Sequence, residues 1–293
     1  MKKFLIFLLI YCPFLSLGAN LIHKSDFVMW QLPTQVNTIG NSYVFQMKNG
    51  KIAVMDGGVK EETQYLRGFI GALGNEVEAW FVSHPHDDHV GALNEILKDP
   101  KGIKIKNIYH SELSQEYYEK YETQYESFTR EFYENLNKSG INVVNITEPG
   151  KILKIDKTNF KILSVRNPEI TENPYNNQSM VIRVEDHLKS MVFLGDLGVE
   201  GGEKLLKGPF RKDLNCDYLQ MAHHGQNGVS KEFYRSIKFD ACLWPTPSWV
   251  YNNDIGKGFN THNLKTIEIR NLMDEIGIKK HYISFMGLVR IDH

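Results

Sequence analysis

Three histidines and two aspartates are concentrated in one six-residue segment of this 293-residue chain. The segment has the spacing H-x-H-x-D-H, with the ligand-type residues His84, His86, Asp88 and His89. Neutral imidazole is the commonest metal ligand in proteins. His84 and His86 lie two residues apart and can point to the same side of an extended loop. Asp88 and His89 then turn toward a second ion, because four side chains this close cannot all reach one tetrahedral ion without strain.

Two later segments end in residues that could complete such a two-metal site. The apolar run 190–194 is typical of a buried strand, and after it Gly195 leads to Asp196, whose carboxylate could bridge two cations. Another short strand is expected over 217–222, and it ends in His223 and His224. One of these histidines would complete the first ion's ligands, and the residues alone leave open which one.

The hexapeptide follows directly on the apolar run 77–82, and in this position it resembles the signature of the metallo-β-lactamase superfamily. Gly91 also follows it and leads into an expected helix through Leu97. The resemblance implies an α/β fold, an αββα sandwich with two mixed sheets between helices. It also implies that Asp196, which ends an F-x-G-D sequence, supplies the bridging carboxylate.

The histidine doublet before a glycine is similar to that of the competence-type DNA-uptake proteins and phosphorylcholine esterases of this superfamily. In several relatives the histidine directly before the glycine is the ligand, so we favour His224, with His223 supporting a ligand or facing substrate. Most members also carry a histidine between the first motif and the bridging aspartate. This chain instead has Asn177 and Ser179 in that stretch, as the similar subgroup does.

Two ligand sets follow from this resemblance. The first ion would be held by His84, His86 and His224, and the second by Asp88, His89 and the shared Asp196. We expect two divalent cations, with Zn²⁺ as the leading choice and Mn²⁺ or Fe as alternatives. The expected reaction is hydrolysis by a metal-bound hydroxide, with Asp88 and Asp196 as catalytic residues.

Further polar residues are candidates for roles around the ions. Asp56 matches the family's early aspartate at a strand end, which implies support for a ligand histidine. His262 could donate a proton to a leaving group, or simply lie among the helix-capping Asn and Thr residues that flank it. His110 could be another ligand or line the cleft. Asn177 and Ser179 offer hydrogen-bond donors for phosphoryl oxygens.

Aromatic residues could form the walls of a substrate site. Trp244 and Trp249 lie in a proline-stiffened loop, where they could line a pocket or serve as packing anchors. The segment 115–138 is expected to be a long helical stretch whose aromatic residues, at spacings of three and four, mark an apolar face or a lid over substrate. These aromatics are Tyr117, Tyr118, Tyr121, Tyr125, Phe128, Phe132 and Tyr133.

The similar subgroup favours a phosphoester or phosphodiester substrate, and the missing middle histidine argues against a true β-lactamase. The alternatives are a lactam, lactone or thioester hydrolase, and a member of the fold that binds metal without turnover. The sequence has 34 basic and 35 acidic residues, so a broad nucleic-acid groove is not indicated. We therefore expect a small-molecule or phosphoester substrate as the partner.

Residues 1–19 are expected to be a signal peptide, because Lys2 and Lys3 precede a short apolar run and small residues follow it. The run is short for a membrane span, so export to the periplasm or the medium is favoured over an uncleaved anchor. Residues 20–293 are expected to form one domain with a helical insertion around 112–140. Cys216 and Cys242 could pair after export or remain buried thiols.

Overall fold

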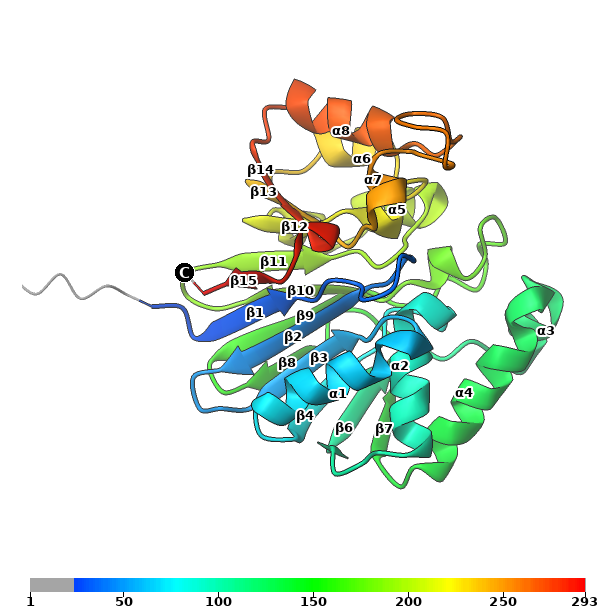
Figure 1. The fold of residues 1–293 in the computed structure, drawn as a ribbon, viewed down its shortest axis with the longest axis vertical. Coiled ribbons are helices and arrows are strands. Elements are labelled where there is room, and N and C mark those ends of the chain that lie inside the picture. The colour runs from blue at the N-terminus through cyan, green and yellow to red at the C-terminus, as the bar shows by residue number, and fades with distance from the viewer. Residues whose placement is uncertain (1–23, 293) are drawn as a thin grey trace, which may run out of the picture.

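Two mixed β-sheets lie face to face between outer layers of helices in the computed structural model, which describes residues 24–292 (Figure 1). The predicted αββα sandwich is thus confirmed. The predicted signal peptide lies outside the described residues, and the division into a leader and one domain stays a prediction. Across residues 24–292, no helix has the length and apolar character needed to cross a membrane.

The first sheet has eight strands in the order β15-β1-β2-β3-β4-β6-β7, with β5 paired to β4. Its strands are β1 (Phe27–Gln31), β2 (Ser42–Met47), β3 (Ile52–Asp56), β4 (Glu76–Phe81), β5 (Lys104–Ile105), β6 (Asn107–His110), β7 (Asn142–Asn145) and β15 (Val289–Ile291). Strands β2 and β3 form an antiparallel hairpin across Lys48, Asn49 and Gly50. The C-terminal β15 pairs antiparallel with β1, so the end of the chain completes the sheet in which it began.

The second sheet has seven strands in the order β14-β13-β12-β11-β10-β9-β8. They are β8 (Ile152–Ile155), β9 (Thr158–Ser164), β10 (Val181–Glu185), β11 (Ser190–Phe193), β12 (Tyr218–Gln220), β13 (Ala241–Trp244) and β14 (Lys280–Ile283). Strands β11 to β14 run parallel to one another, as do β3, β4, β6 and β7 in the first sheet. Parallel neighbours end at the same edge, and this arrangement brings several strand ends together.

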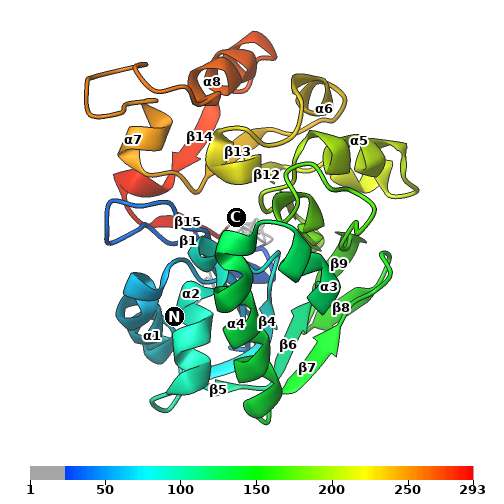
Figure 2. The ribbon, with the colours of Figure 1, turned by 90° about the vertical axis from the view of Figure 1, so that its right-hand side faces the viewer.

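Helices cover the outer face of each sheet (Figure 1; Figure 2). On the first sheet lie α1 (Thr63–Ala72), α2 (Asp87–Lys98) and α4 (Glu126–Lys138), and on the second lie α5 (Val199–Lys207), α6 (Lys231–Arg235) and α8 (Thr266–Glu275). The remaining helices are α3 (Gln115–Lys120), α7 (Ser248–Tyr251) and the 3-10 helices η1 (Lys60–Glu62), η2 (Thr123–Tyr125), η3 (Asn176–Gln178), η4 (Arg211–Leu214), η5 (Ala222–Gly225) and η6 (Ser284–Met286).

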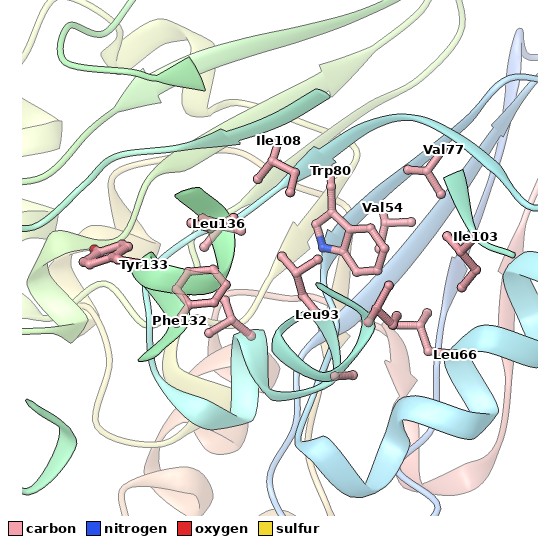
Figure 3. Packing of buried hydrophobic residues seen from close by; sticks show 14 of the residues in the cluster. Val54, Leu66, Val77, Trp80, Leu93, Ile103, Ile108, Phe132, Tyr133 and Leu136 are labelled. Carbon is pink, nitrogen blue, oxygen red and sulfur yellow. The ribbon is translucent and has the colours of Figure 1, made fainter. Parts of the chain in front are cut away.

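Alternating residues of the central strands fill two different cores. In β4, Ala79 and Phe81 face the second sheet, whereas Trp80 faces the helices. Phe81 stacks on Phe160 of the second sheet with ring centroids 4.9 Å apart. Trp80 lies beside Val54 and other residues packed under the helices (Figure 3). A strand buried on both faces in this way is held firmly, and it carries the hexapeptide at its end.

The helical stretch predicted over 115–138 is divided in the structure into α3, η2 and α4. The backbone is extended at Tyr121 and left-handed at Glu122, where φ is 51° and ψ is 50°. This break cannot be seen in the aromatic spacing, because the aromatic residues pack on the same body before and after it. Tyr117 and Tyr118 of α3 and Tyr133 of α4 all lie in the core under the helices, as predicted for an apolar face.

Candidate metal centre

The hexapeptide lies where the chain changes from strand β4 to helix α2. The backbone stays extended at His86, which has φ −71° and ψ 150° at the N-terminal cap of α2. His84 and His86 therefore project from a loop, whereas Asp88 and His89 project from the first turn of the helix. One short segment thus presents four ligand-type side chains in two directions, as its spacing predicts.

Gly91 allows α2 to pack closely on the segment before α1. A Cβ atom at Gly91 would lie only 2.5 Å from the backbone nitrogen of Lys60 and 2.9 Å from the carbonyl carbon of Val59. The next residue, Ala92, donates its backbone N–H to the carbonyl oxygen of Gly58 at 3.0 Å. The glycine of the motif therefore fixes the position of the helix that carries half of the hexapeptide.

The histidine doublet follows β12 in a strained backbone conformation. The φ angles of His223 and His224 are 51° and 56°, in the left-handed region that non-glycine residues seldom adopt. Such strain persists where surrounding contacts over-determine it. His223 N donates to the carbonyl of Gly195 at 3.0 Å, and Thr246 Oγ1 donates to the carbonyl of His224 at 2.6 Å. These bonds hold the doublet against the ends of β11 and β13.

The predicted ligands form two groups that share Asp196. One group consists of His84, His86 and Asp196, and the other of Asp88, His89, Asp196 and His224. Within each group, one donor atom per residue lies within 4.8 Å of the others. His84 Nε2 lies 3.0 Å from His86 Nδ1, and His89 Nε2 lies 3.1 Å from Asp196 Oδ1. The arrangement offers places for two cations on either side of one carboxylate.

The position of His224 differs from the ligand set implied by the family resemblance. His224 Nε2 lies 3.0 Å from Asp88 Oδ2 and 3.2 Å from Asp196 Oδ2, so it belongs to the group of Asp88 and not to that of His84 and His86. The physical reason is that the end of β12 faces the first turn of α2, where Asp88 lies. The His84 group therefore has two histidines and one carboxylate among the described residues.

His223 lies beside these groups without joining either. Its Nε2 is 3.8 Å from Asp196 Oδ2 and 3.5 Å from Asn176 Nδ2. Its side chain is 21% exposed, whereas that of His224 is 1% exposed. His223 thus borders the centre from the side that solvent can reach.

Each clustered histidine has a polar partner on the ring nitrogen that points away from the other ligands. Nδ1 of His89 lies 2.7 Å from Asp56 Oδ2, and Nδ1 of His224 lies 2.9 Å from the carbonyl oxygen of Pro245. A carboxylate or carbonyl oxygen can only accept, so each Nδ1 carries the proton and each Nε2 presents its lone pair inward. Metal-binding histidines are oriented by this kind of outer partner.

Three buried atoms in the centre lack any hydrogen-bond partner among the described residues. They are Nε2 of His89, Nε2 of His224 and Oδ1 of Asp196. Buried polar atoms without partners are rare and costly, and a cation between them would satisfy all three. Imidazole nitrogens together with carboxylates are also a suitable donor set for zinc, manganese or iron. The residues present therefore fit a bound divalent metal.

Buried histidines and carboxylates in the centre shift one another's pKa values. Burial lowers the pKa of His224, but the facing carboxylates of Asp196 and Asp88 outweigh burial and raise it to about 9. Burial raises the pKa of Asp196, yet the facing His224 and His89 hold it well below its ordinary value. The carboxylates thus stay ionised and draw positive charge into a buried site, as a cation site requires.

Asp56 has the contacts that its expected supporting role requires. It is fully buried, and its Oδ1 accepts the backbone N–H of Ser83 at 2.7 Å. Its Oδ2 accepts from Ser83 Oγ at 2.8 Å and from Asn41 Nδ2 at 2.6 Å, besides lying next to His89 Nδ1. Ser83 Oγ is also 3.1 Å from His84 Nδ1, so one network touches both ligand groups.

Two of the predicted accessory residues, Asn177 and His110, have side chains that contact other parts of the protein and lie outside the ligand groups. Both amide hydrogens of Asn177 are engaged, by the carbonyl of Glu172 at 2.8 Å and by Glu200 Oε2 at 2.9 Å. Asn177 therefore ties η3 to α5 and has no hydrogen left for a phosphoryl oxygen. His110 is buried with its ring 5.9 Å from that of Tyr133, and it belongs to neither ligand group. Burial lowers the pKa of His110 to about 4.

Ser179 lies close to the ligands, but its hydroxyl faces protein groups. Its Oγ accepts the backbone N–H of Asp196 at 3.0 Å and lies 3.4 Å from His84 Nδ1. Ser179 thus links the start of β10 to the loops that carry His84 and Asp196. This position supports a role in orienting the ligands more than a role in binding phosphoryl oxygens.

The predicted aromatic and histidine residues of the C-terminal half lie in different environments. Trp244 is fully buried and donates from Nε1 to His281 Nδ1 at 3.1 Å, which supports the packing alternative. Trp249 is half-buried, and its ring lies 6.0 Å from that of His262. Nδ1 of His262 accepts the backbone N–H of Asn263 at 2.8 Å, and among the described residues His262 is outside both ligand groups.

Cys216 and Cys242 are both free thiols in the structure, so the alternative of a disulfide does not hold here. Burial raises the pKa of Cys216 to about 12, which leaves a protonated and unreactive thiol at neutral pH.

Glu122 and Ser83 are site residues that the sequence reasoning missed. Glu122 Oε2 lies 3.0 Å from His86 Nε2, although 36 positions separate the two residues along the chain. Ser83 contacts both Asp56 and His84 through its hydroxyl. No spacing pattern marks Glu122, but the position of Ser83 directly before His84 was a signal that could have been used.

Comparison with known proteins places these features in a family. The model of the metallo-beta-lactamase superfamily matches residues 37–239, which include both ligand groups. A search of curated protein sequences finds no match. Members of this superfamily are generally hydrolytic, and the fold typically binds two divalent metals.

Solved structures share the fold at low sequence identity. The metallo-beta-lactamase fold protein YhfI from Bacillus subtilis is 15% identical with a TM-score of 0.53, and the match covers 92% of this chain and 100% of that one. The diiron beta-hydroxylase CmlA from Streptomyces venezuelae is 9% identical with a TM-score of 0.51, and the match covers 92% of this chain and 54% of that one. These structures show the shared fold, and the family match, which spans more than half of the chain and both ligand groups, shows that the chain belongs to the metallo-beta-lactamase superfamily.

Proposed function

We propose that this protein is a metal-dependent hydrolase that cleaves a phosphoester or phosphodiester at a two-metal centre. The observation that carries the proposal is the pair of ligand groups that share Asp196, with three buried donor atoms that lack partners. Two divalent cations bound there would polarise the scissile bond and lower the pKa of a shared water. No serine or cysteine nucleophile is then required. Among the described residues, Cys216 is half-buried, Cys242 is buried, and neither belongs to a ligand group.

The chain's own residues would hold the substrate between the groups. Asp196 and Asp88 fix the second group from opposite sheets, since each of them approaches His224 Nε2 within 3.2 Å. The first group contributes three protein ligands, so a four-coordinate ion held there would keep one position for a water or a phosphoryl oxygen. The N-N-x-S sequence at 176–179, which takes the place of the usual middle histidine, favours the competence-protein and phosphorylcholine-esterase branch and hence phosphoesters.

His223 is the residue that we assign to the substrate side of the centre. Its Nδ1 lies 3.2 Å from the carbonyl oxygen of Asn227, and because a carbonyl only accepts, Nδ1 carries a proton. Nε2 is thereby directed toward Asp196, at the exposed border of the centre. From this position the unprotonated Nε2 of His223 can accept a proton from a water at the border of the centre, and the imidazolium that results can pass that proton to the leaving group. We propose it for the role that the sequence suggested for His262.

Hydrolysis assays with purified protein test the substrate class. We expect release of p-nitrophenol from bis-p-nitrophenyl phosphate, abolished by a chelator and restored by added zinc, with little turnover of a lactam or a lactone. Turnover of the lactam alone would contradict the phosphoester proposal. Loaded protein that cleaves none of these compounds would favour a metal-binding role without catalysis.

Two neighbouring aspartates provide a matched pair of variants. Asp88 belongs to the second ligand group, whereas Asp87 is exposed on the same helical turn and belongs to neither group. Asp88→Asn should lose zinc and phosphodiesterase activity together, because a neutral amide is a poor ligand beside His89 and His224. Asp87→Asn should keep both properties. Equal loss in the two variants would show that a change of charge on this turn, and not ligation, is responsible.

Export is a separate proposal. The basic and apolar character of residues 1–19 supports cleavage after Gly18 or Ala19. N-terminal sequencing of protein recovered from the periplasm or the medium tests it, and an intact N-terminus in membrane fractions would favour an anchor.

A further inference from the structure

Glu122 approaches the metal centre from a part of the fold that supplies none of the candidate ligands. It lies at the break between α3 and η2, and its backbone is left-handed, with φ 51° and ψ 50°. A residue other than glycine seldom adopts this conformation, and it is retained where surrounding contacts hold it. The contacts of the Glu122 side chain hold the backbone in this conformation.

Both carboxylate oxygens of Glu122 have partners. Oε2 lies 3.0 Å from His86 Nε2, and Oε1 accepts the backbone N–H of Tyr175 at 3.0 Å. The side chain is only 17% exposed. The rings of Tyr125 and Tyr175 also contact the imidazole of His86, with ring centroids 4.5 Å and 5.2 Å away. His86 is therefore held by two aromatic rings and one carboxylate.

This contact determines which nitrogen of His86 faces the first ligand group. The carboxylate of Glu122 accepts and cannot donate, so His86 Nε2 carries the proton. Nδ1 is then the unprotonated nitrogen, and it lies 3.0 Å from His84 Nε2, inside the group. With the opposite tautomer, a proton on Nδ1 would occupy the position of the ion.

We propose that Glu122 is a positioning residue for the ligand group of His84, His86 and Asp196, and that it makes cation binding there depend on the docked α3–η2–α4 segment. The inference rests on the metal binding of the proposed function but not on its substrate. The dependence should be strong, because the group has only two histidines among the described residues and one of them is oriented by Glu122. Removal of an outer carboxylate partner of this kind typically weakens metal affinity by about 10–100-fold.

Zinc titration of metal-free full-length protein tests the inference with Glu122→Gln. The amide keeps the size of the side chain but offers one acceptor oxygen to two donors, His86 Nε2 and the Tyr175 N–H. We expect zinc binding to the first group to weaken by about 10–100-fold while binding to the second group is unchanged. Glu126→Gln is the matched control, since Glu126 belongs to the same segment but pairs with Arg130 at 2.8 Å. It should bind both ions as the wild type does.

Nitrogen-15 NMR of the zinc-loaded wild-type protein gives a second measurement that needs no variant. We expect the side-chain proton of His86 on Nε2. A proton on Nδ1 would overturn the inference even if Glu122→Gln failed to fold.

Unchanged zinc affinities in a folded Glu122→Gln protein would also overturn the inference, and continued phosphodiesterase activity would then leave the proposed function standing. The opposite combination can also be told apart. If Glu122→Gln loses only the first ion and the wild-type protein cleaves no phosphoester, the inference is supported and the proposed function fails.

Discussion

The substitution Asp56→Asn tests whether the network behind the ligands holds the centre together. The side chain of Asp56 is fully buried and faces donors from Ser83, Asn41 and His89 at distances between 2.6 and 2.8 Å. Asparagine has almost the same shape. It also tolerates the left-handed backbone at this position, where φ is 57°. The change therefore alters hydrogen bonding and charge with little added strain.

The expected loss of stability follows from the number of acceptors. An amide oxygen placed at the site of Oδ2 keeps three contacts, but the amide nitrogen then faces the backbone N–H of Ser83, which loses its partner. One buried donor without a partner costs about 1–3 kcal/mol. Replacing the charged acceptor of His89 by a neutral one removes about another 1 kcal/mol. We therefore expect the free energy of unfolding to fall by about 2–4 kcal/mol.

Urea denaturation of the metal-free protein, followed by tryptophan fluorescence, measures this difference without the contribution of metal binding. Asp240→Asn is the control, because Asp240 is exposed and its change should alter stability by less than about 0.5 kcal/mol. A loss for Asp56→Asn no larger than that of the control would refute the reasoning that Asp56 satisfies buried donors. We also expect weaker zinc binding by the second ligand group, since His89 would lose the partner that orients it.

Two further predictions concern how residues that are not candidate ligands affect the free energy of unfolding. Gly225→Ala should lower the free energy of unfolding by about 2–5 kcal/mol, because φ is +78° and a Cβ would lie 2.4 Å from the ring of Trp244. Gly256 has φ +86° and open space around it, so Gly256→Ala should lose only the part of the stability that comes from the positive φ angle. Equal urea midpoints for the two variants would contradict the packing argument. Burial lowers the pKa of Lys189 to about 8 from an ordinary 10.5. Between these two values the unfolded chain binds more protons than the folded one. The free energy of unfolding should therefore rise from about pH 8 to pH 10. Lys189→Met should remove this rise in urea midpoints, and an unchanged pH dependence would show that other groups cause it.

Much of the fold was readable from the chain. The strands β11 and β12 lie where the short apolar runs predicted them, because such patterns act over a few positions. The long helical stretch predicted over 115–138 is helical on both sides of one break, where Tyr121 and Glu122 leave helical geometry. The aromatic period continues through the break, and the contacts that hold Glu122 come from residues far away in sequence.

The identity of the candidate ligands was also determined by the sequence. H-x-H-x-D-H places four donors on an extended loop and the first helical turn after one strand, and Asp196 and His224 each follow the end of another strand. Such positions follow from local geometry and from the rule that parallel strands end at a common edge. Neither rule assigns a ligand to a particular ion.

Only the tertiary structure decided how these ligands are grouped and supported. His224 joins Asp88 because the second sheet packs with the end of β12 against the first turn of α2. Glu122 reaches His86 because the α3–η2–α4 segment docks beside the hexapeptide, and the carbonyl of Pro245 reaches His224 because β12 and β13 are parallel neighbours. Local patterns reflect the geometry of a few neighbouring residues, whereas contacts between distant residues depend on how sheets and helices pack. The sequence therefore determined which residues could bind metal, and the packing of the two sheets decided which of them act together.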